Sequence, residues 1–167
     1  LGDVEEKDFT DAHIDAVLDL PAVDVEAVKA AGFKVALDAV NSVGGIIMPR
    51  LLERMGVECV CVNCEPTGQF AHNPEPLPAN LVELSEAVVA NKADLGISVD
   101  PDVDRLAFIC EDGTMYGEEY TLVTVADYIL KHTPGNTVSN LSSTRALRDV
   151  TRKYGMEHNA AAVGEAN

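Results

Sequence analysis

The hexapeptide at positions 100–105, Asp-Pro-Asp-Val-Asp-Arg, lies between two apolar runs, residues 95–99 and 106–110. Three of its residues are carboxylates at alternate positions, Asp100, Asp102 and Asp104. In so short a turn these carboxylates repel one another unless a hard divalent cation, which prefers oxygen ligands, offsets their charge. Arg105 follows at once and offers a planar fork suited to a phosphoryl group. Because the flanking runs favour strands, the sequence predicts a cation site in a strand-to-strand turn.

Known metal and phosphoryl motifs offer alternatives for this hexapeptide. An EF-hand loop beginning at Asp100 would need Gly at its sixth position, where Arg105 stands, and helices on both sides. A haloacid dehalogenase type phosphatase also has an Asp-x-Asp pair after an apolar strand, but with Thr or Val in place of Asp104. Such a phosphatase also needs a long downstream sequence, and 63 residues follow Asp104. A non-catalytic metal-binding or interaction module stays open as a further alternative.

Composition places the chain among globular proteins and limits its partners. The chain has 167 residues, of which 47% are apolar, enough to bury a core. A net charge of -16 argues against nucleic acid and anionic membranes as partners, since both need a positive surface. The chain contains no run of about 20 apolar residues and no basic, apolar leader, so we expect a cytoplasmic protein.

Four cysteines raise the question of a zinc site. Cys59, Cys61 and Cys64 form a cluster, and Cys110 lies apart in sequence. Structural zinc modules carry paired Cys-x-x-Cys knuckles, which this spacing lacks. Residues 57–62 have the pattern of a buried strand, in which Cys59 and Cys61 share a face. The sequence therefore predicts reduced thiols in the core.

Helical and strand periods alternate along the chain, which is typical of an α/β layer fold. The predicted helices cover residues 7–20, 25–31, 46–55, 81–90, 119–131 and 145–154. The predicted strands cover residues 33–38, 57–62, 95–99, 106–110, 137–141 and 156–163. We expect a three-layer α/β/α domain over residues 1–114, followed by an incomplete second α/β unit over residues 115–167. The acidic turn then lies at the carboxyl end of a strand, where such sheets usually hold ligands.

Residues 63–80 form a long irregular segment interrupted by four prolines. Its pieces Glu65-Pro66, Gly68-Gln69-Phe70 and Asn73-Pro74-Glu75-Pro76, together with the Asp-x-Asp-x-Asp-Arg turn, resemble the second domain of the α-D-phosphohexomutases. The run Ala71-His72-Asn73-Pro74 is similar to the catalytic serine loop of that family, but Ala71 has no nucleophilic oxygen. We therefore interpret His72 as an ordinary loop residue.

The resemblance extends over nearly the whole chain and implies a phosphotransfer role. In this family a phosphoserine exchanges its phosphoryl group with a hexose phosphate through a bisphosphate, and Mg2+ stabilises the charge. By similarity Asp100, Asp102 and Asp104 are the Mg2+ ligands and Arg105 is the catalytic arginine. Glu165 lies where the family's third domain approaches the sugar, and Ser142 stands where some members have Lys. The chain is similar to the bacterial phosphoglucose, phosphomannose and phosphoglucosamine branch.

The resemblance also implies that residues 1–114 are domain II and residues 115–167 part of domain III of a longer enzyme. The partners are then a hexose phosphate and the remaining domains, and the isolated chain has no mutase activity. A strand edge over residues 156–163 would favour self-association. Ser142 and Ser143 are expected to cap the helix that follows them.

Overall fold

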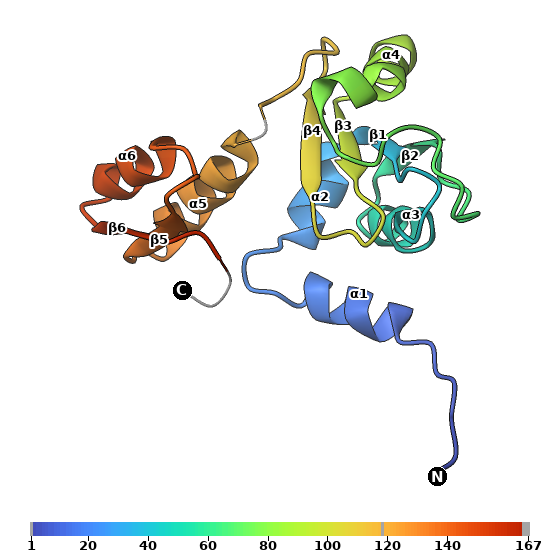
Figure 1. Cartoon of the computed structure of the whole chain (residues 1–167), viewed down its shortest axis with the longest axis horizontal. Coiled ribbons are helices and arrows are strands. Elements are labelled where there is room, and N and C mark those ends of the chain that lie inside the picture. The colour runs from blue at the N-terminus through green and yellow to red at the C-terminus, as the bar shows by residue number, and fades with distance from the viewer. Residues whose placement is uncertain (1, 118, 165–167) are drawn as a thin grey trace. The chain divides into compact units, whose positions relative to one another are not determined.

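The computed structural model describes residues 2–117 and 119–164. These residues form two compact units, which divide between Thr114 and Met115 (Figure 1). The first unit is built on a four-stranded sheet in the order β2-β1-β3-β4. Its strands are β1 (Lys34–Asp38), β2 (Glu58–Val62), β3 (Leu95–Val99) and β4 (Leu106–Cys110). β1 pairs in parallel with β2 and β3, and β4 is antiparallel to β3. The α/β fold class predicted from the sequence is confirmed.

Helices cover both faces of this sheet, and one further helix packs on the outside of a helical layer (Figure 1). They are α1 (Thr10–Leu18), α2 (Val25–Ala31), α3 (Gly44–Arg54) and α4 (Val82–Asn91), with a short 3-10 turn at Pro78–Asn80. The connections through α3 and α4 run in opposite directions along the sheet, and right-handed crossovers then place the two helices on opposite faces. The result is a three-layer α/β/α arrangement.

Strand alternation supplies a separate apolar face for each helical layer. Val35 and Leu37 pack with Leu52 of α3 and Val57, and Leu95 and Ile97 join them on this face. Gly96, between these two β3 residues, faces α4, where an added Cβ would lie 2.8 Å from the Val88 side chain. The missing side chain therefore lets α4 lie close to the sheet.

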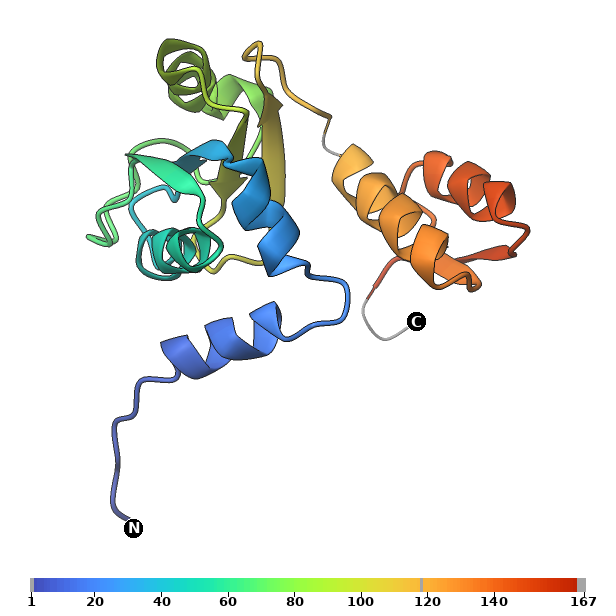
Figure 2. The ribbon, with the colours of Figure 1, turned by 180° about the vertical axis from the view of Figure 1, so that it is seen from behind.

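Helix α1 is attached to the unit through α3. Asp11 and Asp15, one turn apart on α1, pair with Arg50 and Arg54 of α3, each at 2.5 Å. Ile14 lies between the two acidic residues in sequence and is buried. Residues 2–9, which precede α1, have no regular structure and extend away from the sheet (Figure 2).

The cysteine-bearing strand differs from the sequence prediction. β2 is an edge strand whose residues are exposed or half-buried, so the prediction of a buried strand is wrong. Cys59 and Cys61 do share a face, with their sulfur atoms 3.8 Å apart, but Cys61 is exposed and is no core thiol. Burial, followed by the neighbouring Cys61, raises the pKa of Cys59 and of Cys64 to about 12. Periodicity cannot reveal this, because it carries no information on which strand lies at an edge.

The second unit contains α5 (Tyr120–His132), β5 (Thr137–Asn140), α6 (Ala146–Lys153) and β6 (His158–Ala161). β5 and β6 form a two-stranded parallel sheet. Apolar side chains on this unit are exposed, among them Val138 at 65% and Leu141 at 72%. Within the described residues, no helix has the length and apolar character needed to cross a bilayer.

The expected capping role of Ser142 and Ser143 is wrong. Both hydroxyls donate to the side-chain oxygen of Asn140, at 2.8 and 3.0 Å, so they brace the turn after β5. The hydroxyl of Thr144 accepts the N–H of Ala146 at 3.3 Å instead. An Asn at the end of a strand competes for nearby hydroxyl groups, and the sequence pattern alone does not decide which acceptor they choose.

A close approach of two backbone segments at Gly45 provides a test of this fold. A Cβ at Gly45 would overlap the carbonyl oxygen of Cys64, which is backbone and cannot move aside. We expect Gly45→Ala to lower the free energy of unfolding by about 1–3 kcal/mol, as overpacked sites do. Urea unfolding followed by circular dichroism measures the change. Gly135→Ala is the control, because a methyl group there meets nothing within 4 Å; equal stability of the two variants would contradict the packing described.

Candidate functional site

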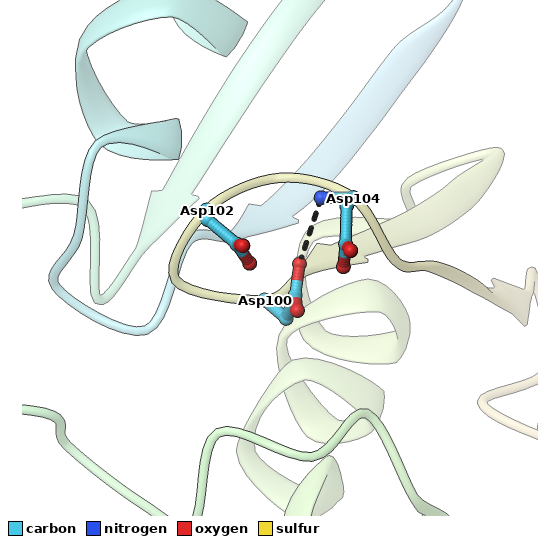
Figure 3. Close-up of side chains that lie close together, drawn as sticks. All are labelled: Asp100, Asp102 and Asp104. Carbon is cyan, nitrogen blue, oxygen red and sulfur yellow. Dashed lines mark hydrogen bonds between the residues drawn. The ribbon is translucent and has the colours of Figure 1, made fainter. Parts of the chain in front are cut away.

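The acidic hexapeptide forms the hairpin loop between β3 and β4, beyond the last ladder pair, Val99 and Leu106. One carboxylate oxygen from each of Asp100, Asp102 and Asp104 lies within 4.8 Å of the others (Figure 3). The structure therefore brings together the three carboxylates that the sequence singled out. The flanking elements are strands, as expected, and not the helices of an EF-hand.

Asp100 anchors the loop. It is only 6% exposed, and its Oδ1 atom accepts the backbone N–H groups of Asp104 and Arg105, both at 3.0 Å. Figure 3 shows the first of these bonds, which runs across the loop from the backbone nitrogen of Asp104 to the Asp100 carboxylate. Asp102 and Asp104 remain exposed, so two of the three carboxylates face solvent, where an ion could reach them.

Two further features fix the shape of the loop. The Ser42 hydroxyl, in the turn after β1, donates to the carbonyl of Pro101 at 2.8 Å. Val103 has a φ of 63°, in the left-handed region that β-branched residues rarely adopt. Strain of this kind persists only where the surroundings impose it, and it is frequent at ligand sites.

The electrostatics of the loop favour a cation. The charge of Asp102 is the main cause that raises the pKa of Asp104, followed by the hydrogen bond and charge of Asp100, while Arg105 acts in the opposite direction. A bound divalent ion would reverse this repulsion. Oxygen-only donors suit Mg2+, Ca2+ or Mn2+ better than zinc or copper.

Arg105 does not pair closely with the carboxylates of its own loop. Its Nε atom lies 3.8 Å from Asp100 and 3.9 Å from Asp104, beyond hydrogen-bond distance. Its Nη1 atom instead donates to the Glu75 carboxylate, and this bond is the main cause of the raised pKa of Arg105. Sequence reasoning noticed Glu75 only as part of a motif and missed this pairing.

His72 is not the ordinary loop residue predicted from the sequence. Its Nε2 atom lies 2.9 Å from Oδ2 of Asp38, a fully buried carboxylate at the end of β1, and its Nδ1 atom lies 2.8 Å from the Asn73 carbonyl. Both ring nitrogens face acceptors, and this arrangement favours the protonated imidazolium form. Burial lowers the pKa of His72, but the hydrogen bonds to Asn73 and Asp38 and the charge of Asp38 outweigh it, and the net pKa is raised. Asp38 stands in an otherwise apolar strand, and this pattern in the sequence was the signal that its buried carboxylate needs a hydrogen-bonding partner.

The remaining site prediction, Glu165, lies outside the described residues. Ser142 belongs to the turn after β5, where its hydroxyl donates to Asn140. The other predicted residues, Asp100, Asp102, Asp104 and Arg105, form one loop of the first unit.

Comparison with known proteins agrees with this geometry. Residues 11–113 match the family described as phosphoglucomutase/phosphomannomutase, alpha/beta/alpha domain II. The chain belongs to the phosphoglucomutase/phosphomannomutase family. The matched residues include the entire acidic loop and the segment that carries His72 and Glu75.

Curated relatives extend this family likeness over both units. A phosphoglucomutase/phosphomannomutase of Thermococcus kodakarensis is 34% identical over 99% of the chain and 36% of its own length. A probable phosphoglucosamine mutase of Methanopyrus kandleri is 32% identical over 98% of the chain and 36% of its own length. The chain thus spans about a third of the length of these relatives.

Solved structures of family members have the same fold. A phosphoglucomutase/phosphomannomutase family protein of Burkholderia thailandensis superposes with a TM-score of 0.84 at 27% identity, covering 97% of this chain and 35% of that one. A putative phosphomannomutase of Thermus thermophilus gives a TM-score of 0.87 at 23% identity, covering 98% and 38%, and supports the fold alone.

The His72–Asp38 pair predicts that the stability of this domain depends on pH. Because the pKa of His72 is raised above its ordinary value of 6.5, the pair stabilises the fold fully below pH 6.5. This stabilisation is lost as the pH rises through the raised pKa. We expect the wild type to be more stable than His72→Gln at low pH. The difference between their free energies of unfolding, measured by urea titration, should decrease as the pH rises from 6.5 through the raised pKa of His72. His13→Gln, on an exposed part of α1, is the control; a pH-independent difference for His72 would contradict the pairing.

Proposed function

We propose that the protein containing this chain is a phosphohexomutase that interconverts hexose 1-phosphates and hexose 6-phosphates. In the proposed reaction a phosphoserine gives its phosphoryl group to the sugar phosphate, and the resulting bisphosphate returns its other phosphoryl group to the serine. Family membership supports the reaction class. The observation that carries the proposal is the convergence of three carboxylates within 4.8 Å in the matched domain.

Mg2+ is the cation that we propose for this loop. Asp100, Asp102 and Asp104 supply oxygen atoms only, which fits a hard divalent ion, and the raised pKa of Asp104 reflects charge that such an ion would offset. When bound, the ion would neutralise negative charge on the transferring phosphoryl group. Asp100 would also hold the loop in shape, because its Oδ1 atom accepts two backbone hydrogen bonds.

Arg105 is proposed to bind the phosphoryl group. A guanidinium has five N–H donors in a fixed plane, so it can keep its bond to Glu75 and still offer donors to phosphoryl oxygens. Its side chain is 55% exposed, which leaves it accessible to a substrate. We also propose a cytoplasmic location, which the four free thiols support.

The phosphoserine is proposed to come from another part of the protein. None of the chain's six serines is followed by His-Asn-Pro, the sequence after the family's reactive serine. Ser98 is buried, and Ser42 and Ser142 donate to neighbouring oxygen atoms. This chain would therefore supply the metal loop and Arg105, with the remaining domains contributing the phosphoryl carrier and the sugar site.

The proposed metal ligands can be tested by calorimetry on the complete protein that contains residues 1–167. Asp102→Asn should weaken Mg2+ binding by at least about tenfold, since even residues that only orient metal ligands change affinity by about 10–100-fold. Glu111→Gln is the matched control, because it removes an exposed charge seven residues beyond Asp104. Unchanged Mg2+ affinity in Asp102→Asn would contradict the assignment.

The proposal that the metal loop and the phosphoserine lie in different parts of the protein can be tested by activity assays. We expect the complete protein to turn over glucose 1-phosphate, mannose 1-phosphate or glucosamine 6-phosphate when Mg2+ and a trace of hexose bisphosphate are present. Residues 1–167 alone should show no turnover, because a metal loop without a phosphoryl carrier has nothing to transfer. Activity of the isolated chain that is abolished by Ser142→Ala would show that the nucleophile lies within it.

A further inference from the structure

We propose that Glu75 is a positioning residue for Arg105, and that a continuous series of contacts from the buried Asp38 holds Glu75 in place. This inference rests on the proposed function, in which Arg105 binds the phosphoryl group. It gives residues 63–80 a specific role, namely to hold one edge of the guanidinium so that the other edge is available to the substrate.

The backbone around Glu75 is braced on both sides. Its N–H donates to the side-chain oxygen of Asn73 at 3.1 Å. Its carbonyl accepts the N–H of Leu77 and the side-chain amide of Asn80, both at 2.8 Å. The residues before and after Glu75 are prolines, which fix their own φ angles. The Glu75 carboxylate therefore projects from a backbone with little freedom.

The contacts that hold Glu75 in place extend to the end of β1. Asn73, which accepts the N–H of Glu75, also offers its carbonyl to Nδ1 of His72, and Nε2 of His72 contacts Asp38. Asp38 is buried and accepts the N–H of Val40 at 2.9 Å. A fully buried carboxylate is a fixed point, because it moves only with the strand that carries it. The contacts thus connect the end of β1 to the guanidinium beside the loop that follows β3.

The geometry of Arg105 shows what Glu75 does. Nη1 donates to Glu75, and Nε lies 3.8 Å from Asp100 and 3.9 Å from Asp104. The Arg105 side chain is 55% exposed, so the guanidinium donors that Glu75 does not use are accessible to a phosphoryl oxygen. Without Glu75, the half-exposed guanidinium could turn toward the two loop carboxylates that it nearly reaches. Glu75 therefore keeps Arg105 apart from the proposed metal ligands and oriented for substrate.

The first test measures kinetics on the complete protein. Glu75→Gln keeps the shape of the side chain and removes its charge, and we expect it to lower kcat and kcat/KM about tenfold with a small change in KM, as for an interaction made in the transition state. If Glu75 acts through Arg105, the same substitution in an Arg105→Gln background should change kcat less than twofold. Glu86→Gln, an exposed Glu of α4, is the matched control. Equal losses in both backgrounds, or no loss in either, would overturn the inference.

The second test does not depend on activity. Nitrogen NMR of the Arg105 guanidinium should show slowed exchange of its protons with solvent in the wild type and in Glu86→Gln, and faster exchange in Glu75→Gln. Identical spectra for all three would overturn the inference. A wild-type protein without any mutase turnover would instead contradict the proposed function, and the NMR comparison would still decide whether Glu75 holds Arg105.

Discussion

The mutual repulsion of three carboxylates at the end of β3 is the constraint around which the first unit is arranged. Asp100 is buried and fixed by two backbone N–H groups, so it cannot move away from Asp104. Ser42, Val103 and the antiparallel pairing of β3 with β4 hold the remaining loop in one shape. This keeps the carboxylates together before any cation arrives, and preorganisation of that kind reduces the cost of binding.

The proline-rich segment contributes a second fixed arrangement near the same edge of the sheet. It makes few regular hydrogen bonds of its own, yet it contacts the end of β1 through His72 and the acidic loop's Arg105 through Glu75. The contact through His72 is partly buried, whereas the ion pair through Glu75 is half exposed and therefore weaker in water. A segment without regular structure is thereby held firmly at one end and can orient a side chain at the other.

Sequence reasoning succeeded where local periodicity decides the structure. The helix at residues 25–31 and the strands at residues 95–99 and 106–110 have the predicted bounds, because glycine, apolar runs and the acidic turn limit them directly. It failed where long-range packing decides. Cys61 is exposed because β2 is an edge strand. A separate failure is local, because Ser142 donates to Asn140, two residues before it, and caps no helix.

The sequence by itself determined the α/β fold class and the acidic loop with Arg105, since alternating periods and a run of alternate carboxylates are local patterns. Only the tertiary structure decided which residues support that loop. Glu75 and Arg105 are 30 residues apart, and His72 and Asp38 are 34 apart, and no local pattern couples them. Their pairing follows from the parallel order of β1 and β3, which brings the carboxyl ends of the two strands to one edge of the sheet.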